Sequence, residues 1–205
     1  MPVNNHFVSN YINSLSYSRP IIYGGITYQE ERPNQTQLLR WIYGKKREAL
    51  NSEIRKKDIY VSFLTLNFMI QKDTFEKASF NENIPNLRYE DTLFSYDLKR
   101  KKIPITHIEN PVCHLGLESS EIFLSKSKES LDALNLFLNQ KLINANYIRI
   151  SKIKNRLQKF KLDLLLSTIY PSLKTRFEKN LLSNTPSLFV FDLYRLSYLC
   201  YISKK

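Results

Sequence analysis

Two of the four glycines in this 205-residue chain stand side by side inside a short apolar run. The run from Ile21 to Tyr28 carries Ile, Tyr and Thr, which favour extended backbone, on both sides of Gly24 and Gly25. A glycine inside a strand marks a bulge or a close approach of other backbone, because it has no side chain to hold that backbone away. The sequence therefore predicts a strand over 21–28 that is interrupted at its centre.

Helical and extended segments alternate over the first 143 residues. Apolar residues at helical spacing predict helices over 6–15, 38–51, 92–101 and 120–142, with Thr92 as the cap of the third. β-branched and aromatic residues predict strands over 59–70 and 103–108, and a polar surface loop is expected over 81–91. This alternation predicts an α/β fold with a mixed sheet that is flanked by helices.

The composition changes after Ile143. Residues 151–183 mix Lys and Arg with Leu, Ile and Phe at helical spacing, and Pro171 is expected to divide them into two helices. An aromatic-rich helix is predicted over 186–202. We therefore predict two parts, an α/β portion over 1–143 and a basic, aromatic-rich helical region over 144–205.

The net charge of +12 belongs mainly to the second part. Residues 1–140 hold 18 Lys and Arg against 16 Asp and Glu, whereas residues 141–205 hold 13 against 3. Such a tail can attract phosphate groups at an anionic membrane or on nucleic acid, and a solvated helical face explains the same charges equally well. No zinc-finger or aromatic ribonucleoprotein motif accompanies it, so no nucleic-acid partner is expected.

The remaining composition indicates a reduced, cytoplasmic setting. Cys113 and Cys200 have no metal-ligand spacing and form no disulfide framework. No apolar window reaches the ~20 residues that span a bilayer, and the first ten residues lack the pattern of a secretory signal. A cytoplasmic location is predicted, with peripheral contact at the inner face of the cell membrane as the role considered for the tail.

The pair Glu90-Asp91 is the sharpest local feature. It falls between the polar loop and the predicted helix, in the sequence Tyr-Glu-Asp-Thr-Leu-Phe over 89–94. A carboxylate at a helix N-terminus is stabilised by the backbone N–H groups there, so Asp91 as a helix cap beside a solvated Glu90 is one interpretation. A catalytic carboxylate pair is the other.

Six motifs in the first 140 residues together resemble the second half of bacterial family-2 glycosyltransferases, including the galactosyltransferase-like members. In that family a GG-x-x-Y strand precedes an LRW-x-YG-x-x-RE segment, and an NF strand, a hydrophobic-x-ED motif and an H-I-[DE]-N-P-V-x-H strand follow. Each motif alone is weak, whereas their order and spacing are more specific. In this chain they are Gly24 to Tyr28, Leu39 to Glu48, Thr65 to Ile70, Phe80 to Glu82, Tyr89 to Phe94 and His107 to His114.

The resemblance implies a GT-A fold and inverting transfer of a sugar from a sugar nucleotide to a hydroxyl of a glycan or glycolipid acceptor. It implies that Asp91 is the general base, that Glu90 orients the acceptor or supports the base, and that a divalent metal (Mn²⁺ or Mg²⁺) offsets charge on the diphosphate. His114 is the expected metal ligand, with His107 as the second candidate. Asn67 and Trp41 are the expected substrate-binding residues, with a buried, hydrogen-bonded Asn67 as the alternative for the first. Trp41, Tyr28 and Tyr43 form either an acceptor-stacking surface or part of the core beside a helix.

Two departures from the family pattern affect these expectations. Tyr89 stands before the pair where many members have Gly or another small residue. No Asp-x-Asp motif, which binds metal and diphosphate in the family, occurs in the 205 residues. The expectation is a chain that begins just downstream of that motif, lacks the donor-binding half and is inactive alone. The alternative is a non-catalytic membrane- or partner-binding module on the same fold.

Overall fold

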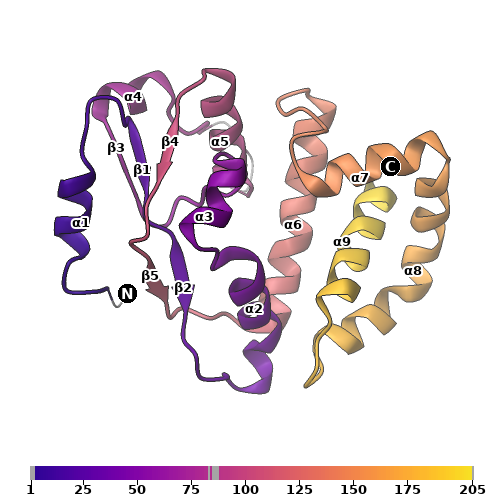
Figure 1. The fold of residues 1–205 in the computed structure, drawn as a ribbon. Helices are drawn as coiled ribbons and strands as arrows, with labels where there is room; N and C mark the ends of the chain where they lie inside the picture. The colour runs from indigo at the N-terminus through magenta and orange to yellow at the C-terminus, as the bar shows by residue number, and fades with distance from the viewer. Residues whose placement is uncertain (1–2, 83, 85–87, 205) are drawn as a thin grey trace. The chain divides into compact units, whose positions relative to one another are not determined.

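A computed structural model describes residues 3–82, 84 and 88–204, and these form two compact units of a mixed α/β chain (Figure 1). The first unit comprises Met1–Glu31, Tyr43–Ile84 and Glu90–Leu117, and the second comprises Arg32–Ile42, Pro85–Tyr89 and Glu118–Lys205. The division after Leu117 differs from the predicted boundary at 143. The helix that follows Leu117 packs with the C-terminal helices, so it belongs to the second unit.

The first unit is built on two small sheets. Strand β1 (Ile21–Tyr23) lies at the centre of a three-stranded sheet, antiparallel to β3 (Phe68–Ile70) and parallel to β4 (Ile105–His107). Strand β2 (Ile26–Tyr28) pairs in parallel with β5 (Val112–His114), which places Tyr28 opposite His114. The chain therefore passes three times from one sheet to the other.

Gly24 and Gly25 form the first of these passages, as the predicted interruption of the 21–28 strand requires. The pairing continues across the passage, because the N–H of Asn110 donates to the carbonyl of Gly24 at 3.1 Å and the N–H of Val112 donates to that of Gly25 at 3.2 Å. A side chain at Gly24 would lie 2.6 Å from the Asn110 carbonyl oxygen. The glycine pair thus permits the close backbone approach.

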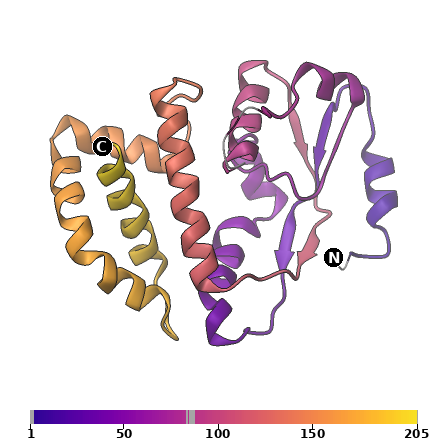
Figure 2. The same cartoon turned by 180° about the vertical axis from the view of Figure 1, so that it is seen from behind.

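Helices cover both faces of the three-stranded sheet. Helix α1 (Phe7–Ser14) lies on one face, and α3 (Ser52–Arg55) and α5 (Glu90–Arg100) lie on the other, as Figures 1 and 2 show from opposite sides. The core beneath α5 contains the fully or nearly buried side chains of Ile21, Tyr23, Phe63, Phe94, Leu98 and Ile105. The remaining elements of this unit are the π-helix η2 (Gly44–Glu48), the 3-10 helix η3 (Lys56–Asp58) and α4 (Lys72–Lys77).

The predicted strand over 59–70 is wrong except for its last three residues. After η3 the chain turns, because the Asp58 side chain accepts from the N–H of Val61 at 3.2 Å and the N–H of Ser62 donates to the Asp58 carbonyl at 3.1 Å. The aromatic content of this segment reflects burial of Phe63 in the core rather than extended backbone.

The start of one helix and the end of another also differ from the prediction. Helix α5 begins at Glu90, so Thr92 lies inside it and is not its cap. The helix predicted over 38–51 consists of α2 (Leu38–Tyr43) continued by η2, which ends at Glu48. The loop predicted over 81–91 falls partly outside the described residues, since 83 and 85–87 are not described.

The second unit is helical. Helix α9 (Leu188–Ile202) packs against both α6 (Ser120–Asn139) and α8 (Leu162–Leu181), and α7 (Arg149–Lys159) precedes α8. Leu131 and Leu134 of α6 and Phe191 and Leu199 of α9 are almost completely buried. The 3-10 helix η1 (Gln35–Gln37) and the start of α2 complete the unit.

The helix break that was predicted at Pro171 lies elsewhere. Pro171 is inside α8, and the chain breaks between α7 and α8 at Lys161, whose φ of 57° is in the left-handed region. A proline removes one helical hydrogen bond but does not force an end to a helix that is held by packing on both sides of it; Tyr170 and Leu181 of α8 are both buried.

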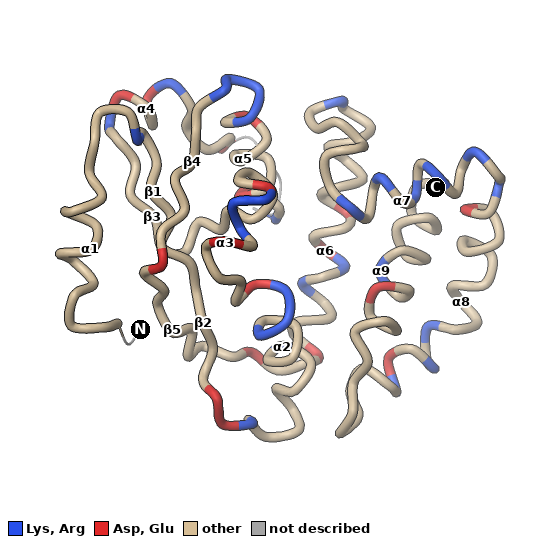
Figure 3. Tube along the Cα trace, in the orientation of Figure 1, with Lys and Arg blue, Asp and Glu red and all other residues tan. Residues whose placement is uncertain are grey.

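The charges follow the predicted asymmetry. Figure 3 shows Lys and Arg along α7 and at the turn into α8, whereas both signs are mixed in the first unit. Within the described residues, no helix combines the length and the apolar character that crossing a bilayer requires.

Candidate functional site

Asp91 lies in the first turn of α5, directly after Glu90, which opens the helix. Its Oδ1 atom accepts hydrogen bonds from the backbone N–H of Thr92 at 2.7 Å and from the Thr92 hydroxyl at 3.3 Å. Burial raises the pKa of the Asp91 carboxyl, and the nearby carboxylates of Glu90 and Glu48 raise it further, against the lowering effect of the Thr92 bonds. The carboxyl is therefore more basic than an exposed aspartate.

Glu48, whose charge contributes to the raised pKa of Asp91, is bonded to the second sheet. The hydroxyl of Tyr28, on β2, donates a hydrogen bond to Oε2 of Glu48 at the end of η2. The Tyr28 ring packs on the imidazole of His114, with 5.4 Å between ring centroids and 32° between planes. Glu48 thus acts on Asp91 through its charge and is hydrogen-bonded to Tyr28, which packs on His114. We call these four residues of the first unit the carboxylate–histidine series.

Gly44 explains how this series fits together. A Cβ atom at Gly44 would lie 2.3 Å from the Tyr28 ring, so only glycine lets the ring pass across η2 to reach Glu48. Gly44 also stands where α2 gives way to the wider π-helix. A π-helical turn of this kind is frequent at functional sites.

The divalent metal was expected for a complete enzyme, with an incomplete site in this chain, and that expectation stays a prediction. Across 3–82, 84 and 88–204, no group of three or more His, Cys, Asp or Glu side chains is arranged to hold a metal ion. His114 faces a tyrosine ring, and its role as a metal ligand stays a prediction. We derive no chemical step through a metal.

The second histidine considered as a ligand, His107, belongs to the core. Its side chain is buried, its ring meets that of Tyr23 edge-on at 5.3 Å, and its Nε2 lies 2.8 Å from the carbonyl oxygen of Ile59. Since a carbonyl only accepts, Nε2 carries the proton. Burial lowers the pKa of His107 and keeps the ring neutral.

The Asn67 side chain bonds the backbone at the glycine pair to the backbone between β4 and β5. Its Nδ2 donates to the carbonyls of Gly25 at 2.7 Å and Asn110 at 2.9 Å, and its Oδ1 accepts from the Tyr11 hydroxyl at 2.8 Å. The side chain is 7% exposed. These bonds give Asn67 a structural role, and the predicted contact with substrate stays a prediction.

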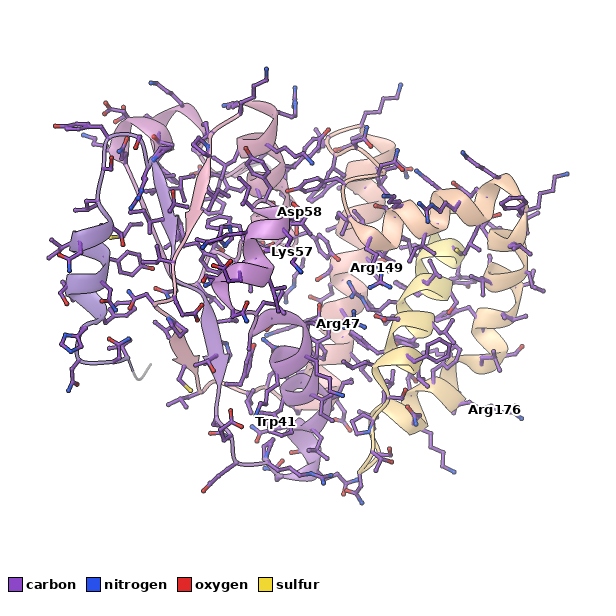
Figure 4. All side chains as sticks on the ribbon, viewed as in Figure 1. Trp41, Arg47, Lys57, Asp58, Arg149 and Arg176 are labelled. Atoms are coloured by element: carbon purple, nitrogen blue, oxygen red, sulfur yellow. The ribbon has the colours of Figure 1, made fainter. Side chains whose placement is uncertain are left out.

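Trp41 and Tyr89 belong to the second unit, whereas Asp91 belongs to the first. Trp41 is half-buried on α2 (Figure 4), and the site described above is built without it. Tyr89 has a φ of 62°, and its hydroxyl accepts from Nη2 of Arg195 at 2.9 Å. The residue that replaces the usual small one before the carboxylate pair thus stands in a backbone region that favours glycine.

Sequence reasoning missed Arg55, a buried arginine that bonds the backbone at the glycine pair. Its side chain is 1% exposed, its Nη2 donates to the carbonyls of Ile108 at 2.7 Å and Gly24 at 3.3 Å, and its guanidinium lies 4.8 Å from the Tyr23 ring centroid. Oε2 of Glu109 is 3.8 Å away. The only sequence signal was the glycine pair, which called for a close neighbour without saying which one.

Comparison of the chain with known proteins finds no detectable relative. No protein-family model matches the chain, and no curated protein or solved structure is detectably similar to it.

Proposed function

We propose that the first unit is the acceptor-side portion of a family-2 glycosyltransferase, in which Asp91 acts as general base on an acceptor hydroxyl. The observation that carries this proposal is the setting of Asp91: a half-buried carboxyl with a raised pKa at the start of α5, near the carboxylates of Glu90 and Glu48. The order of the six sequence motifs supports it independently.

The chemistry follows from that setting. As the acceptor oxygen attacks the anomeric carbon, its proton passes to the Asp91 carboxylate, and the bond from that carbon to the nucleoside diphosphate breaks. A base is most effective when its pKa approaches the working pH, and burial together with two neighbouring negative charges moves Asp91 in that direction. The Thr92 bonds fix the carboxylate orientation.

Of the two rings in the series, that of His114 is partly exposed, whereas Tyr28 is 2% exposed and supports the imidazole from within the fold. Glu48 anchors the tyrosine hydroxyl. Aromatic faces and carboxylates are the groups that bind the apolar and hydroxylated sides of a sugar ring. Because the 205 residues contain no Asp-x-Asp motif, the proposal includes that this chain alone transfers no sugar.

Acceptor binding tests the proposal without a donor. A panel of mono- and oligosaccharides would be screened against the full chain by ligand-detected NMR. We expect at least one saccharide to bind, on the order of millimolar as for small ligands with few anchoring contacts, and Asp91→Ala to abolish the signal.

Asp97→Ala is the matched control. Asp97 lies on the same helix, and burial raises its pKa as well, but the nearby cations of Arg100 and Lys101 oppose that rise. It should leave saccharide binding intact. A panel without any binder, or equal losses from the two variants, would contradict the proposal.

A further inference from the structure

The turn between α7 and α8 gathers positive charge on an exposed surface. Lys152, Arg156 and Lys159 follow at helical spacing on α7 and are exposed, and Lys161 is exposed in the turn itself. Figure 3 shows these blue segments along α7 and at its junction with α8. None of the four forms an ion pair among the described residues.

The same turn exposes large apolar side chains. Phe160, at the end of α7, is 74% exposed, and Leu165, in the first turn of α8, is 57% exposed. Leu162 and Leu164 between them are each nearly half exposed. Burying these side chains would be favourable by roughly 25 cal/mol for each Å² of apolar area removed from water.

The C-terminal end of α9 joins this surface. The Lys204 side chain donates from Nζ to the carbonyl of Leu164 at 3.2 Å, which fixes a further exposed cation beside the leucines. Asp163 is the one acidic residue in this stretch, and it is half-buried. We call the whole surface the basic corner, and it consists of Lys152, Arg156, Lys159, Phe160, Lys161, Leu162, Leu164, Leu165 and Lys204.

We infer that the basic corner docks on the surface of an anionic lipid bilayer. Phe160 and the three leucines would enter the boundary between headgroups and acyl chains, while the surrounding lysines and arginine contact lipid phosphates. This occupant uses both halves of the surface. Nucleic acid would match the cations but has no counterpart for three exposed leucines, since its recognition depends on phosphate contacts and base stacking on aromatic rings.

Vesicle sedimentation with the full chain tests the inference. Vesicles of phosphatidylcholine with about 30% phosphatidylglycerol should sediment the protein at low salt, and vesicles of phosphatidylcholine alone should sediment much less. Arg156→Gln with Lys159→Gln should weaken binding roughly 30-fold, since each basic residue near the surface contributes about one kcal/mol. Phe160→Ser should weaken it about tenfold.

Matched controls lie at the other end of the α8–α9 hairpin. Phe189, at the start of α9, is 71% exposed, so Phe189→Ser removes an equally exposed ring. Arg176→Gln with Lys179→Gln removes two exposed cations near the end of α8 (Arg176 is labelled in Figure 4). Both controls should bind vesicles like the wild type, and circular dichroism checks that every variant is folded.

Three results would overturn the inference. One is an absence of binding to the anionic vesicles at low salt. Another is loss of binding in the controls equal to that in the basic-corner variants. The third is tighter binding to a short single-stranded RNA, measured by fluorescence anisotropy, that Arg156→Gln with Lys159→Gln weakens and Phe160→Ser leaves unchanged. The inference does not depend on the proposed transferase activity.

Discussion

Gly25 has no room for a side chain. Its φ of +88° lies in the region that favours glycine, and a Cβ atom there would stand 2.3 Å from Nη1 of the buried Arg55. Arg55 cannot move away easily, because its Nη2 bonds the carbonyls of Gly24 and Ile108. The chain can therefore pass from β1 to β2 at this point only because residue 25 has no Cβ atom.

Gly25→Ala should destabilise the chain by about 2–5 kcal/mol, because it adds left-handed backbone strain to the displacement of a buried charge. Urea denaturation followed by circular dichroism measures this. Gly116→Ala is the control: its nearest neighbour would be Cε1 of His114 at 3.9 Å, so its midpoint should stay close to that of the wild type. Equal effects of the two substitutions would show that the steric argument is wrong.

Asp91 makes the stability of the fold depend on pH. Because its pKa is raised in the folded protein, the folded state binds a proton more tightly than the unfolded state does. The ionised carboxyl thus costs stability above the folded pKa, and this cost vanishes as pH falls through that value toward the usual aspartate pKa. Each unit of pKa difference corresponds to about 1.4 kcal/mol.

Asp91→Asn should therefore raise the free energy of unfolding at neutral pH, and the gain should shrink as the pH is lowered toward about 4. Denaturation midpoints over a pH series give the difference directly. Glu31→Gln, at an exposed position, should show no such trend. If Asp91→Asn were less stable than wild type at neutral pH, the ionised carboxylate would be a stabilising group, contrary to the account.

At the scale of elements, α8 carries a proline in its interior. Pro171 has no N–H to donate to the carbonyl of Ser167, one turn earlier, and it is exposed. The helix persists because its inner face packs against α9, where the rings of Tyr170 and Tyr194 lie 5.9 Å apart.

Pro171→Ala should stabilise the helical unit by about 1–2 kcal/mol, since it restores a helical hydrogen bond and loses part of that gain to a freer unfolded chain. Thermal denaturation of the full chain provides the readout. Ser172→Ala, at the neighbouring exposed position, should shift the midpoint little. A lower midpoint for Pro171→Ala would mean that the proline shapes α8 in a way the packing requires.

The elements that sequence predicts well are those with a local cause. The helices near residues 7–14, 120–139 and 188–202 follow from apolar spacing, and the 21–28 strand breaks at its glycines as expected. The segment before β3 was predicted wrongly because burial of Phe63 in a tertiary core gives the same residue preferences as a strand. The helix break predicted at Pro171 was wrong for a related reason. Packing of α8 on α9 outweighs the free-energy cost of the helical hydrogen bond that the proline cannot make.

For the candidate site, the sequence shows the carboxylate pair and His114 as motifs, and the structure holds Asp91 and His114 in one unit. Their predicted roles stay predictions. Glu48, which accepts a hydrogen bond from Tyr28, was not predicted as a site residue, because this contact across 20 residues arises from packing of η2 on β2. Arg55 was not predicted as a buried residue for the same reason. A basic stretch of sequence indicates a solvated surface unless the core around it is known.

At the scale of the whole molecule, charge and candidate chemistry occupy different units. The carboxylate–histidine series lies in the first unit, whereas the basic corner lies in the second. Neither unit offers, among its described residues, a set of side chains that could hold a metal for a diphosphate. Binding of a complete donor by this chain is therefore not expected.

Isothermal titration with uridine diphosphate sugars and Mn²⁺ should give no binding in the micromolar range. The physical reason is that the sequence has no Asp-x-Asp motif and that the described part of the chain has no metal-holding cluster. Titration of Mn²⁺ alone is the control for nonspecific metal uptake. Saturable micromolar binding of the sugar nucleotide would contradict this part of the account.

The central claim is that Asp91 is a proton acceptor for a bound saccharide, and its side-chain carboxyl signal tests that claim most directly. Carbon-detected NMR would follow the titration of Asp91 with and without the saccharide that binds best, with Asp97 of the same helix as internal reference. The account predicts a pKa above the ordinary aspartate value that shifts again when saccharide is added, while Asp97 does not respond to it. An Asp91 carboxyl that titrates at the ordinary value and ignores saccharide would contradict it.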